Sequence, residues 1–235
     1  MDELALWANG YGLELNTAQL EQFTLYEALL LEWNERISLT AIRDRREIRI
    51  RHFLDSLTCV QATGPLNGRA LIDVGTGAGF PGLPLKILYP SLALTLVDSV
   101  EKKARFLELV VGELGLTDVV VIADRAETLG RLPAYREQFD WATARAVAEL
   151  RVLIELLLPL CRVGGHMLAQ KGESAHAEAD TARQATTATG GGKPDIVTVQ
   201  LPEVDQAHYL VTIPKIAPTN QRYPRRPGMP AKRPL

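Results

Sequence analysis

The residues with the clearest chemical meaning form a glycine-rich loop directly after a short apolar run. Gly75, Gly77 and Gly79 follow the run Leu71–Val74. Glycine lets the backbone approach a ligand closely, and a helix that begins after such a loop offers unpaired N–H groups to the same ligand. We therefore expect these three glycines to bind a cofactor through their backbone.

The same letters also satisfy the fingerprint of dinucleotide-binding folds if it is started at Gly77. We reject that interpretation because the first glycine of the fingerprint should stand at the strand end, which is Gly75, and from there the spacing fails. Pro81 and Pro84 also lack the N–H groups that a pyrophosphate-binding helix needs.

Acidic residues follow the next two apolar runs. Asp98 and Ser99 come directly after Ala93–Val97, where a carboxylate can bind two ribose hydroxyls. The run Val119–Ile122 is followed by residues 124–127, which include the acids Asp124 and Glu127. Three such features at strand ends indicate one ligand site at one edge of a sheet.

Apolar runs alternate with helical segments through the middle of the chain. Strands are expected at Ala70–Val74, Ala93–Val97, Val119–Ile122, Trp141–Thr143 and His166–Ala169. Helices are expected at about 84–89, 101–114, 126–131 and 149–161. This alternation predicts a parallel sheet with helices on both faces. Two final runs, Asp195–Leu201 and Tyr209–Ile213, are too close to hold a helix between them and predict an antiparallel hairpin.

The two ends of the chain differ from this middle. Apolar residues at helical spacing predict a helix over 20–37, and a basic helix is expected from about 44 to 60. The chain then divides into a helical N-terminal cap (1–62), an α/β domain (63–214) and a basic Pro-rich tail (215–235). We expect the tail to be extended or disordered rather than helical.

Composition narrows the class of protein. The chain is 46% hydrophobic and 23% charged, as in ordinary globular proteins. It has no apolar stretch long enough to span a bilayer as a helix, and its two cysteines are too few for a disulfide scaffold or a zinc cluster. We expect a cytoplasmic monomer that does not bind membranes.

Charge is distributed unevenly although the net charge is only −2. Residues 1–33 contain acidic residues but no Lys or Arg, 36–51 are rich in arginine, and 215–235 contain cations but no acid. This asymmetry predicts a basic face built from two separate segments. The alternative is a solvated surface on which the acidic N-terminal helix pairs with the arginines.

The pattern Asp-x-Gly-x-Gly-x-Gly that begins at Asp73 resembles the first motif of class I S-adenosylmethionine methyltransferases. The resemblance implies a Rossmann-like, seven-stranded, mostly parallel α/β sheet with a terminal antiparallel hairpin, and places 124–127 beside the adenine. The chain lacks an Asn-Pro-Pro-Tyr-like tetrad for amine methylation. Cys161, expected inside an apolar helix, is a poor nucleophile for 5-methylcytosine formation. A ligand-free α/β domain with a tight glycine turn stays open as the alternative.

Longer segments resemble one family of this class, the bacterial 16S rRNA (guanine-N7)-methyltransferases, also called glucose-inhibited division protein B. The resemblance covers nearly the whole chain, through segments 33–42, 51–57, 73–82, 97–99, 125–127, 143–148, 171–172 and 223–228. One departure is Gln170, where the resemblance leads us to expect an apolar residue.

The resemblance implies methyl transfer from S-adenosylmethionine to N7 of a guanine in the decoding-region loop of 16S ribosomal RNA. We expect this RNA to be bound within a small-subunit particle, and free RNA, an assembly intermediate and the mature subunit all stay open as the form of the substrate. It implies cofactor contacts from Gly75, Phe80, Ala126, Glu127 and Arg145, which join Gly77, Gly79, Asp98 and Ser99. RNA contacts are expected from Arg46, Arg49, Lys171, Arg225 and Arg226.

Guanine N7 carries a lone pair and no proton at neutral pH, so we expect neither a general base nor a metal. Alignment of the reacting atoms and exclusion of water should supply most of the catalysis. Arg145 is the candidate for positioning, and a salt bridge that fixes the next loop is its alternative role. A structural role is favoured for Asp55, and His52 is left outside the catalytic set. A catalytically silent cofactor-binding RNA chaperone and a small-molecule methyltransferase stay open as other functions; only an RNA substrate predicts steep salt dependence.

Overall fold

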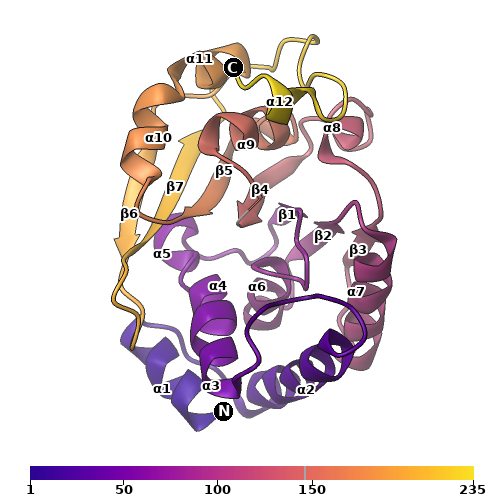
Figure 1. The fold of residues 1–235 in the computed structure, drawn as a ribbon, viewed down its shortest axis with the longest axis vertical. Helices are drawn as coiled ribbons and strands as arrows, with labels where there is room; N and C mark the ends of the chain where they lie inside the picture. The colour runs from indigo at the N-terminus through magenta and orange to yellow at the C-terminus, as the bar shows by residue number, and fades with distance from the viewer. Residues whose placement is uncertain (146) are drawn as a thin grey trace.

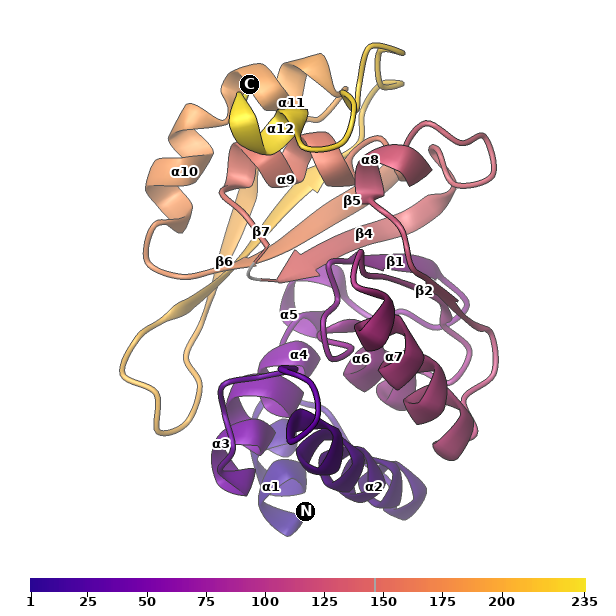
Figure 2. The same cartoon turned by 45° about the vertical axis from the view of Figure 1, so that its right-hand side comes forward.

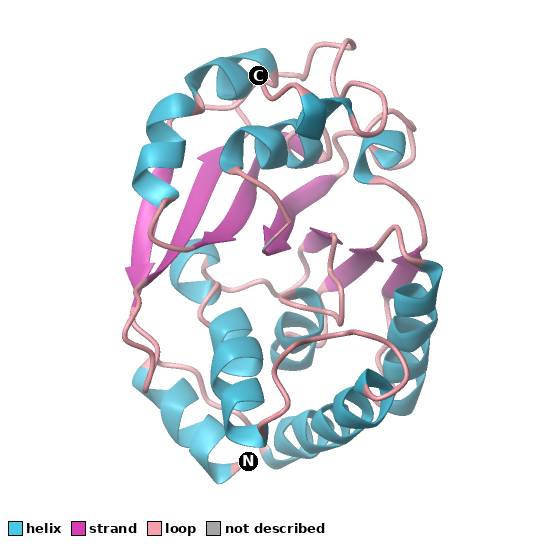
Figure 3. Ribbon diagram, viewed as in Figure 1, coloured by secondary structure: helices cyan, strands magenta, loops and turns pink. Residues whose placement is uncertain are grey.

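The computed structural model describes residues 1–145 and 147–235. Its centre is a seven-stranded sheet in the order β3-β2-β1-β4-β5-β7-β6 (Figures 1 and 3). The strands are β1 (Ala70–Val74), β2 (Ala93–Val97), β3 (Val119–Ile122), β4 (Phe139–Arg145), β5 (Cys161–Lys171), β6 (Asp195–Val199) and β7 (His208–Pro214). β7 runs antiparallel to β5 and β6, whereas the pairs among β1 to β5 are parallel. The predicted parallel sheet with a terminal antiparallel hairpin is confirmed.

Strand boundaries were predicted best where the apolar run is short and ends in turn residues. β1, β2 and β3 match the predicted runs residue for residue. β4 and β5 are longer than predicted, because their pairing continues through polar positions to Arg145 and Gln170. The expected placement of Cys161 in a helix was wrong. The preceding helix ends at Leu157, and Cys161 is a buried residue that begins β5.

Helices cover both faces of the sheet (Figure 2). One face carries α6 (Gly82–Leu88) and α7 (Glu101–Glu113), and the other carries α8 (Ala126–Leu129), α9 (Leu150–Leu157), α10 (Ala175–Thr181) and α11 (Arg183–Ala188). The buried apolar side chains accordingly form two clusters. α10 and α11 were not among the predicted helices.

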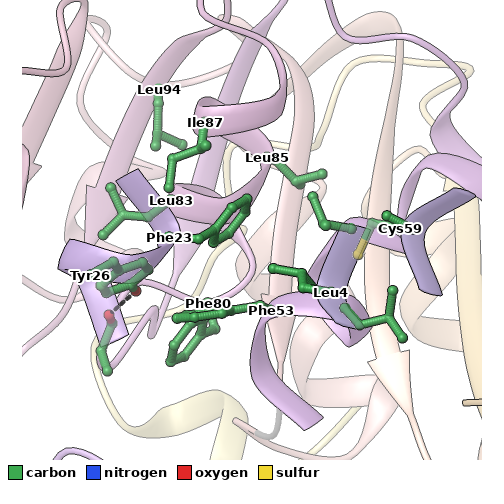
Figure 4. Close-up of a cluster of buried hydrophobic side chains, with 14 of the residues drawn as sticks. Leu4, Phe23, Tyr26, Phe53, Cys59, Phe80, Leu83, Leu85, Ile87 and Leu94 are labelled. Atoms are coloured by element: carbon green, nitrogen blue, oxygen red, sulfur yellow. Dashed lines mark hydrogen bonds between the residues drawn. The ribbon is translucent and has the colours of Figure 1, made fainter. Parts of the chain in front are cut away.

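The N-terminal segment adds a further helical layer on the α6 and α7 face. α1 (Asp2–Gly10) is followed by α2 (Thr17–Asn34), whose first turn is closed by a capping box between Asn16 and Gln19. Figure 4 shows Phe23 and Tyr26 of α2 packed near Phe53 and Phe80. Because Phe80 directly follows the glycine loop, the helical layer supports that loop from below.

The basic helix expected from about 44 to 60 is present as an uninterrupted helical run over 45–57, which contains a π-helical stretch. The run consists of α3 (Arg45–Ile48), a π-helical segment (Arg49–Leu54) and α4 (Asp55–Leu57), and α5 (Val60–Thr63) follows after a turn. π-Helical turns are rare and often occur at functional sites. Here the wide turn carries His52 and leads into Asp55, and both residues line a cavity at the sheet edge.

The C-terminal tail is packed against the domain, which corrects the expectation of an extended or disordered segment. Lys215 is buried, with its Nζ 2.7 Å from the carbonyl oxygen of Leu158. Arg136 donates hydrogen bonds to the carbonyls of Thr219 and Tyr223, at 2.7 and 2.8 Å. The tail ends in a short helix, α12 (Met229–Lys232). Side chains from the domain that satisfy tail carbonyls explain why so Pro-rich a segment is ordered.

Candidate active site

The carboxyl ends of β1, β2 and β4 lie side by side, because these three strands are neighbours in the parallel part of the sheet. This edge brings together the glycine loop after β1, Asp98 after β2 and Arg145 at the end of β4. Ligands of open α/β sheets bind outside the carboxyl ends of their strands. The predicted meeting of these residues at one edge is confirmed.

The glycine loop adopts a backbone that other residues tolerate poorly. Gly75, Gly77 and Gly79 all have positive φ angles, of 65°, 61° and 105°. A Cβ at Gly79 would lie 2.6 Å from the Tyr26 hydroxyl, and a Cβ at Gly75 would lie 2.7 Å from the Val147 side chain. Both conformation and close packing therefore require glycine at this turn.

Asp98 is positioned by the backbone of its neighbours. Its Oδ2 accepts a hydrogen bond from the N–H of Gly77 at 3.0 Å, and its Oδ1 accepts one from Val100 at 2.9 Å. The side chain is nearly buried, and the Lys103 ammonium lies 3.9 Å away. A carboxylate held in this way at the end of β2 fits the predicted contact with a ribose diol.

Asp73 lies buried below the glycine loop. Its Oδ2 accepts hydrogen bonds from Thr76 Oγ1 at 2.7 Å and from the Gly82 N–H at 2.8 Å. Its Oδ1 has no hydrogen-bond partner among the described residues. Burial raises the pKa of this carboxyl to about 6, although both hydrogen bonds oppose the rise.

This pKa predicts that cofactor binding depends on pH. A cationic cofactor favours the ionised form of Asp73, and below pH 6 binding must first remove its proton. The dissociation constant for S-adenosylmethionine should therefore fall by up to about tenfold between pH 5 and pH 7 and then level off. Calorimetric titration across this range measures it. Asp73→Asn should flatten the profile, and an unchanged profile in that variant would contradict the assignment.

The residues predicted to bind the adenosine part of the cofactor line a cavity of about 90 Å³ at the ends of β2 and β3, which we call the adenosine-side cavity. Its walls include Gly75, Asp98, Ser99, Ala126, Glu127 and Val147. The carboxylate of Glu127 accepts a hydrogen bond from the N–H of Gly228, at 2.8 Å, so the tail also reaches this wall. The glycine turn and the carboxylates that are predicted to bind the adenosyl group therefore lie at one cavity.

A second cavity, of about 440 Å³, lies at the ends of β4 and β5 beside the π-helical segment. Arg145 lines this cavity, and Val147, two residues later, lines the adenosine-side cavity. The two cavities therefore adjoin the same loop after β4. The segment 143–148 that carries part of the family resemblance includes Ala146, which is outside the described residues.

Asp55 is the acidic centre of the larger cavity. Its Oδ2 accepts hydrogen bonds from Arg145 Nη1 and from Gln170 Nε2, both at 3.1 Å, and its Oδ1 lies 2.9 Å from Nδ1 of His208. Sequence reasoning favoured a structural role for Asp55 and did not single out His208. The partners of Asp55 lie 90 to 153 residues away along the chain, so no local pattern revealed the cluster.

Arg145 is held in place from three sides. Besides Asp55, it donates to the carbonyl oxygen of Arg51 at 3.0 Å, and its guanidinium lies 4.9 Å from the centre of the Phe80 ring. The His52 ring stacks on the same Phe80 at 4.6 Å. Burial, and secondly the charge of Arg145, lower the pKa of His52 to about 4, so His52 is neutral at pH 7. The salt bridge foreseen as an alternative for Arg145 exists, within the cavity wall itself.

The arginines near the N-terminus are paired with acids of the protein. Arg46 forms ion pairs with Glu3 and Glu203, and Arg49 donates to Glu27 at 2.7 Å. Glu3 and Glu27 belong to the acidic helices α1 and α2. The interpretation in which acidic helices pair with these arginines is therefore confirmed for both residues, and contact with RNA stays a prediction for them.

Three further residues expected to contact RNA differ in their surroundings. Lys171 donates to Glu178 at 2.8 Å. Arg225 binds the fully buried Glu155 through its backbone N–H, Nε and Nη2, with distances of 2.6 to 3.1 Å. Arg226 is exposed and forms no ion pair among the described residues. Of Arg225 and Arg226, Arg226 is the one whose charge is available to a partner.

This difference predicts that substitutions of these two adjacent arginines change the free energy of unfolding by very different amounts. Arg225→Ala should lower the free energy of unfolding by about 3 kcal/mol, because it leaves the buried carboxylate of Glu155 without a cation and with only the backbone N–H of residue 225 from this pair. Arg226→Ala should change it by less than about 0.5 kcal/mol. Denaturant titration measures both, and equal effects would contradict the assignment of Arg225 to the protein's own packing.

Comparison with known proteins gives a consistent family. Residues 19–207 match the family model described as GidB, rRNA small subunit methyltransferase G. The chain is similar to the ribosomal RNA small subunit methyltransferase G of Roseiflexus castenholzii, with 53% identity over 100% of both chains, and to that of Dehalococcoides mccartyi, with 44% identity over 100% of both.

Solved structures show the same fold at low identity. A SAM-dependent O-methyltransferase from Thermotoga maritima superposes with a TM-score of 0.55 and 14% identity, covering 81% of this chain and 72% of that one. A 16S rRNA (adenine(1408)-N(1))-methyltransferase from Catenulisporales acidiphilia gives a TM-score of 0.52 and 16% identity, covering 70% and 93%. The fold is that of class I S-adenosylmethionine-dependent methyltransferases. The matched family model and the full-length relatives place this chain in the rRNA small subunit methyltransferase G family, as an S-adenosylmethionine-dependent methyltransferase.

Proposed function

We propose that this enzyme methylates N7 of a guanine in the decoding-region loop of 16S ribosomal RNA. The observation that carries the proposal is the larger cavity, which contains the buried carboxylate of Asp55. Arg145 links this cavity to the glycine loop, because its guanidinium lies against Phe80, the residue after Gly79. A base extruded from the RNA and read by hydrogen bonds needs a pocket of this kind.

The chemistry requires little proton transfer from the protein. The cofactor supplies an electrophilic methyl group on sulfur. The lone pair of guanine N7 forms the new carbon–nitrogen bond while the carbon–sulfur bond breaks, so no base needs to remove a proton from N7. The methylated guanine carries a positive charge, and the Asp55 carboxylate stabilises that charge as it develops. Arg145, fixed by Asp55 and Phe80, orients the base.

The five residues predicted to contact RNA differ in whether their charge is already paired with an acid of the protein. Arg226 is exposed, whereas Arg46, Arg49, Lys171 and Arg225 already have acidic partners. We infer that Arg226 contacts phosphate directly, and that the paired cations position the surface around the cavity. Phosphate contacts of this kind orient the RNA without reading its sequence.

The cellular setting follows from the same proposal. A decoding-region loop is part of the small subunit, so the substrate is the ribosomal RNA within a small-subunit particle, and the enzyme acts as a cytoplasmic monomer. No helix among the described residues has the length and apolar character needed to cross a bilayer.

The decisive experiment transfers labelled methyl groups from S-adenosylmethionine to small-subunit RNA, free or in particles, that lacks the modification. Mass mapping then identifies the modified nucleotide. We expect a single 7-methylguanosine in the decoding-region loop. Cofactor binding without any RNA labelling would favour a silent RNA-binding protein, and labelling of small molecules alone would favour a different methyltransferase.

A further inference from the structure

The wall of the base cavity contains a polar side chain where the family resemblance leads us to expect an apolar one. Gln170 lies on β5, paired with Arg145 of β4 on one side and with Leu210 of β7 on the other. It is 7% exposed. Its Nε2 donates to the backbone oxygen of Asp55 at 3.0 Å and to the Oδ2 of Asp55 at 3.1 Å.

The other end of the same amide is unsatisfied. Since both contacts of Nε2 are acceptors, they determine which end of the amide carries the oxygen. The Oε1 of Gln170 is buried and has no hydrogen-bond partner within residues 1–145 and 147–235. A buried acceptor without a donor destabilises a protein, and an apolar side chain would avoid that cost. Gln170 lines the adjacent cavity, so a ligand bound there is a candidate for the missing donor.

We propose that Gln170 is a specificity-determining residue whose Oε1 accepts a hydrogen bond from the Watson–Crick edge of the target guanine. The proposal rests on the guanine-N7 function proposed above. β4, which carries Arg145, is the neighbour of β1 and its glycine loop, and Gln170 lies one strand further away. In the proposed complex, the guanine presents N7 towards the glycine loop and its opposite edge towards β5.

That opposite edge distinguishes the purines. Guanine carries two donors there, N1–H and the 2-amino group, whereas adenine presents an unprotonated N1, which is an acceptor. Two acceptors that face each other repel, so Gln170 favours guanine over adenine. A site built to accept a hydrogen bond from its substrate discriminates against analogues that lack the donor.

A double-mutant cycle between the protein and the RNA tests the contact. Gln170→Leu introduces the apolar character that the family resemblance leads us to expect, and Gln184→Leu is the matched control at an exposed position. Substrate RNAs carry guanine, inosine (without the 2-amino group) or 2-aminopurine (without N1–H and O6) at the target position. The kcat/KM for methyl transfer is measured for each pair. The intrinsic reactivity of N7 differs among these bases but cancels in the cycle.

Gln170→Leu should lower kcat/KM on guanine RNA by about fivefold, the effect of one neutral hydrogen bond. For at least one analogue, the loss of kcat/KM relative to guanine RNA should be about fivefold larger for the wild type than for Gln170→Leu. Gln184→Leu should behave as wild type with all three RNAs. The melting temperature of Gln170→Leu should change by no more than about 4 °C, because removal of the unsatisfied oxygen offsets the loss of the two hydrogen bonds to Asp55.

Other outcomes overturn the proposal in distinguishable ways. Gln170 would have a structural role only if the losses of kcat/KM from Gln170→Leu and from the base change were additive for both analogues. The same conclusion would follow if Gln170→Leu lowered the melting temperature and reduced kcat/KM equally on all three RNAs. Gln170→Met provides a second apolar variant if the leucine packs poorly. If the wild type forms no 7-methylguanosine on guanine RNA, the proposed function itself fails. If the wild type forms 7-methylguanosine but the effects of the protein and RNA changes are additive, the proposed role of Gln170 fails and the proposed function stands.

Discussion

Replacement of Asp55 by Asn is expected to lower kcat by about 100-fold while the affinity for S-adenosylmethionine changes by less than about twofold. The substitution removes the buried negative charge of the base cavity, which we propose to stabilise the cation that develops on the methylated base. It also weakens the contact that holds Arg145, so that the base is positioned less well. Asp55 does not line the adenosine-side cavity, which is why cofactor binding should be retained.

The measurement separates chemistry from folding. Single-turnover methyl transfer with saturating enzyme reports the chemical step, and calorimetric titration of the same sample reports cofactor binding and the fraction of folded enzyme. Asp180→Asn, at an exposed position on α10, removes the same charge outside the cavity and should leave kcat unchanged. A kcat for Asp55→Asn within threefold of wild type would contradict a role for this carboxylate in the reaction.

Replacement of Asp98 by Ala should have its main effect on the cofactor instead. The dissociation constant should rise by about 100-fold, because two charge-assisted hydrogen bonds to the ribose are lost. The backbone of the glycine loop also loses its anchor, since Asp98 accepts the hydrogen bond from Gly77. At saturating cofactor, kcat should recover to within a few-fold of wild type, because Asp98 does not line the base cavity.

Equilibrium titration with S-adenosylmethionine and with S-adenosylhomocysteine measures this loss. Both ligands carry the ribose, so both should weaken to a similar extent. Glu108→Ala, on the exposed side of α7, controls for the change in net charge. If cofactor affinity is retained while kcat collapses, Asp98 acts in the reaction and not on the ribose.

The sequence by itself determined the sheet and the cofactor edge. Runs such as Ala70–Val74 and Ala93–Val97 are short, apolar and followed at once by glycine or aspartate, so the strand and its end are both encoded in neighbouring residues. The alternation of strands and helices then places the carboxyl ends of β1 to β5 on one edge, because strands joined by helical crossovers run parallel. Asp98 and the glycine loop could be assigned in this way without any knowledge of packing.

The base cavity was decided only by the tertiary structure. Asp55 meets Arg145, Gln170 and His208 because a π-helical turn from the N-terminal cap packs against the ends of β4, β5 and β7. A local pattern carries no information about such contacts. The helix predicted for about 44–60 is found over 45–57, but apolar spacing does not reveal that its turns widen at 49–54 or that it ends at a turn after Leu57.

The tail shows the same division. Its proline content and charge were visible in the sequence and suggested a free basic segment. The structure instead pairs Arg225 with Glu155, which is 70 residues away, and Gly228 with Glu127, which is 101 residues away. Burial of Glu155 requires a cation beside it, and which arginine supplies that cation depends on the path of the chain over α9. Sequence encodes the residues that can do chemistry, whereas long-range packing decides which of them meet.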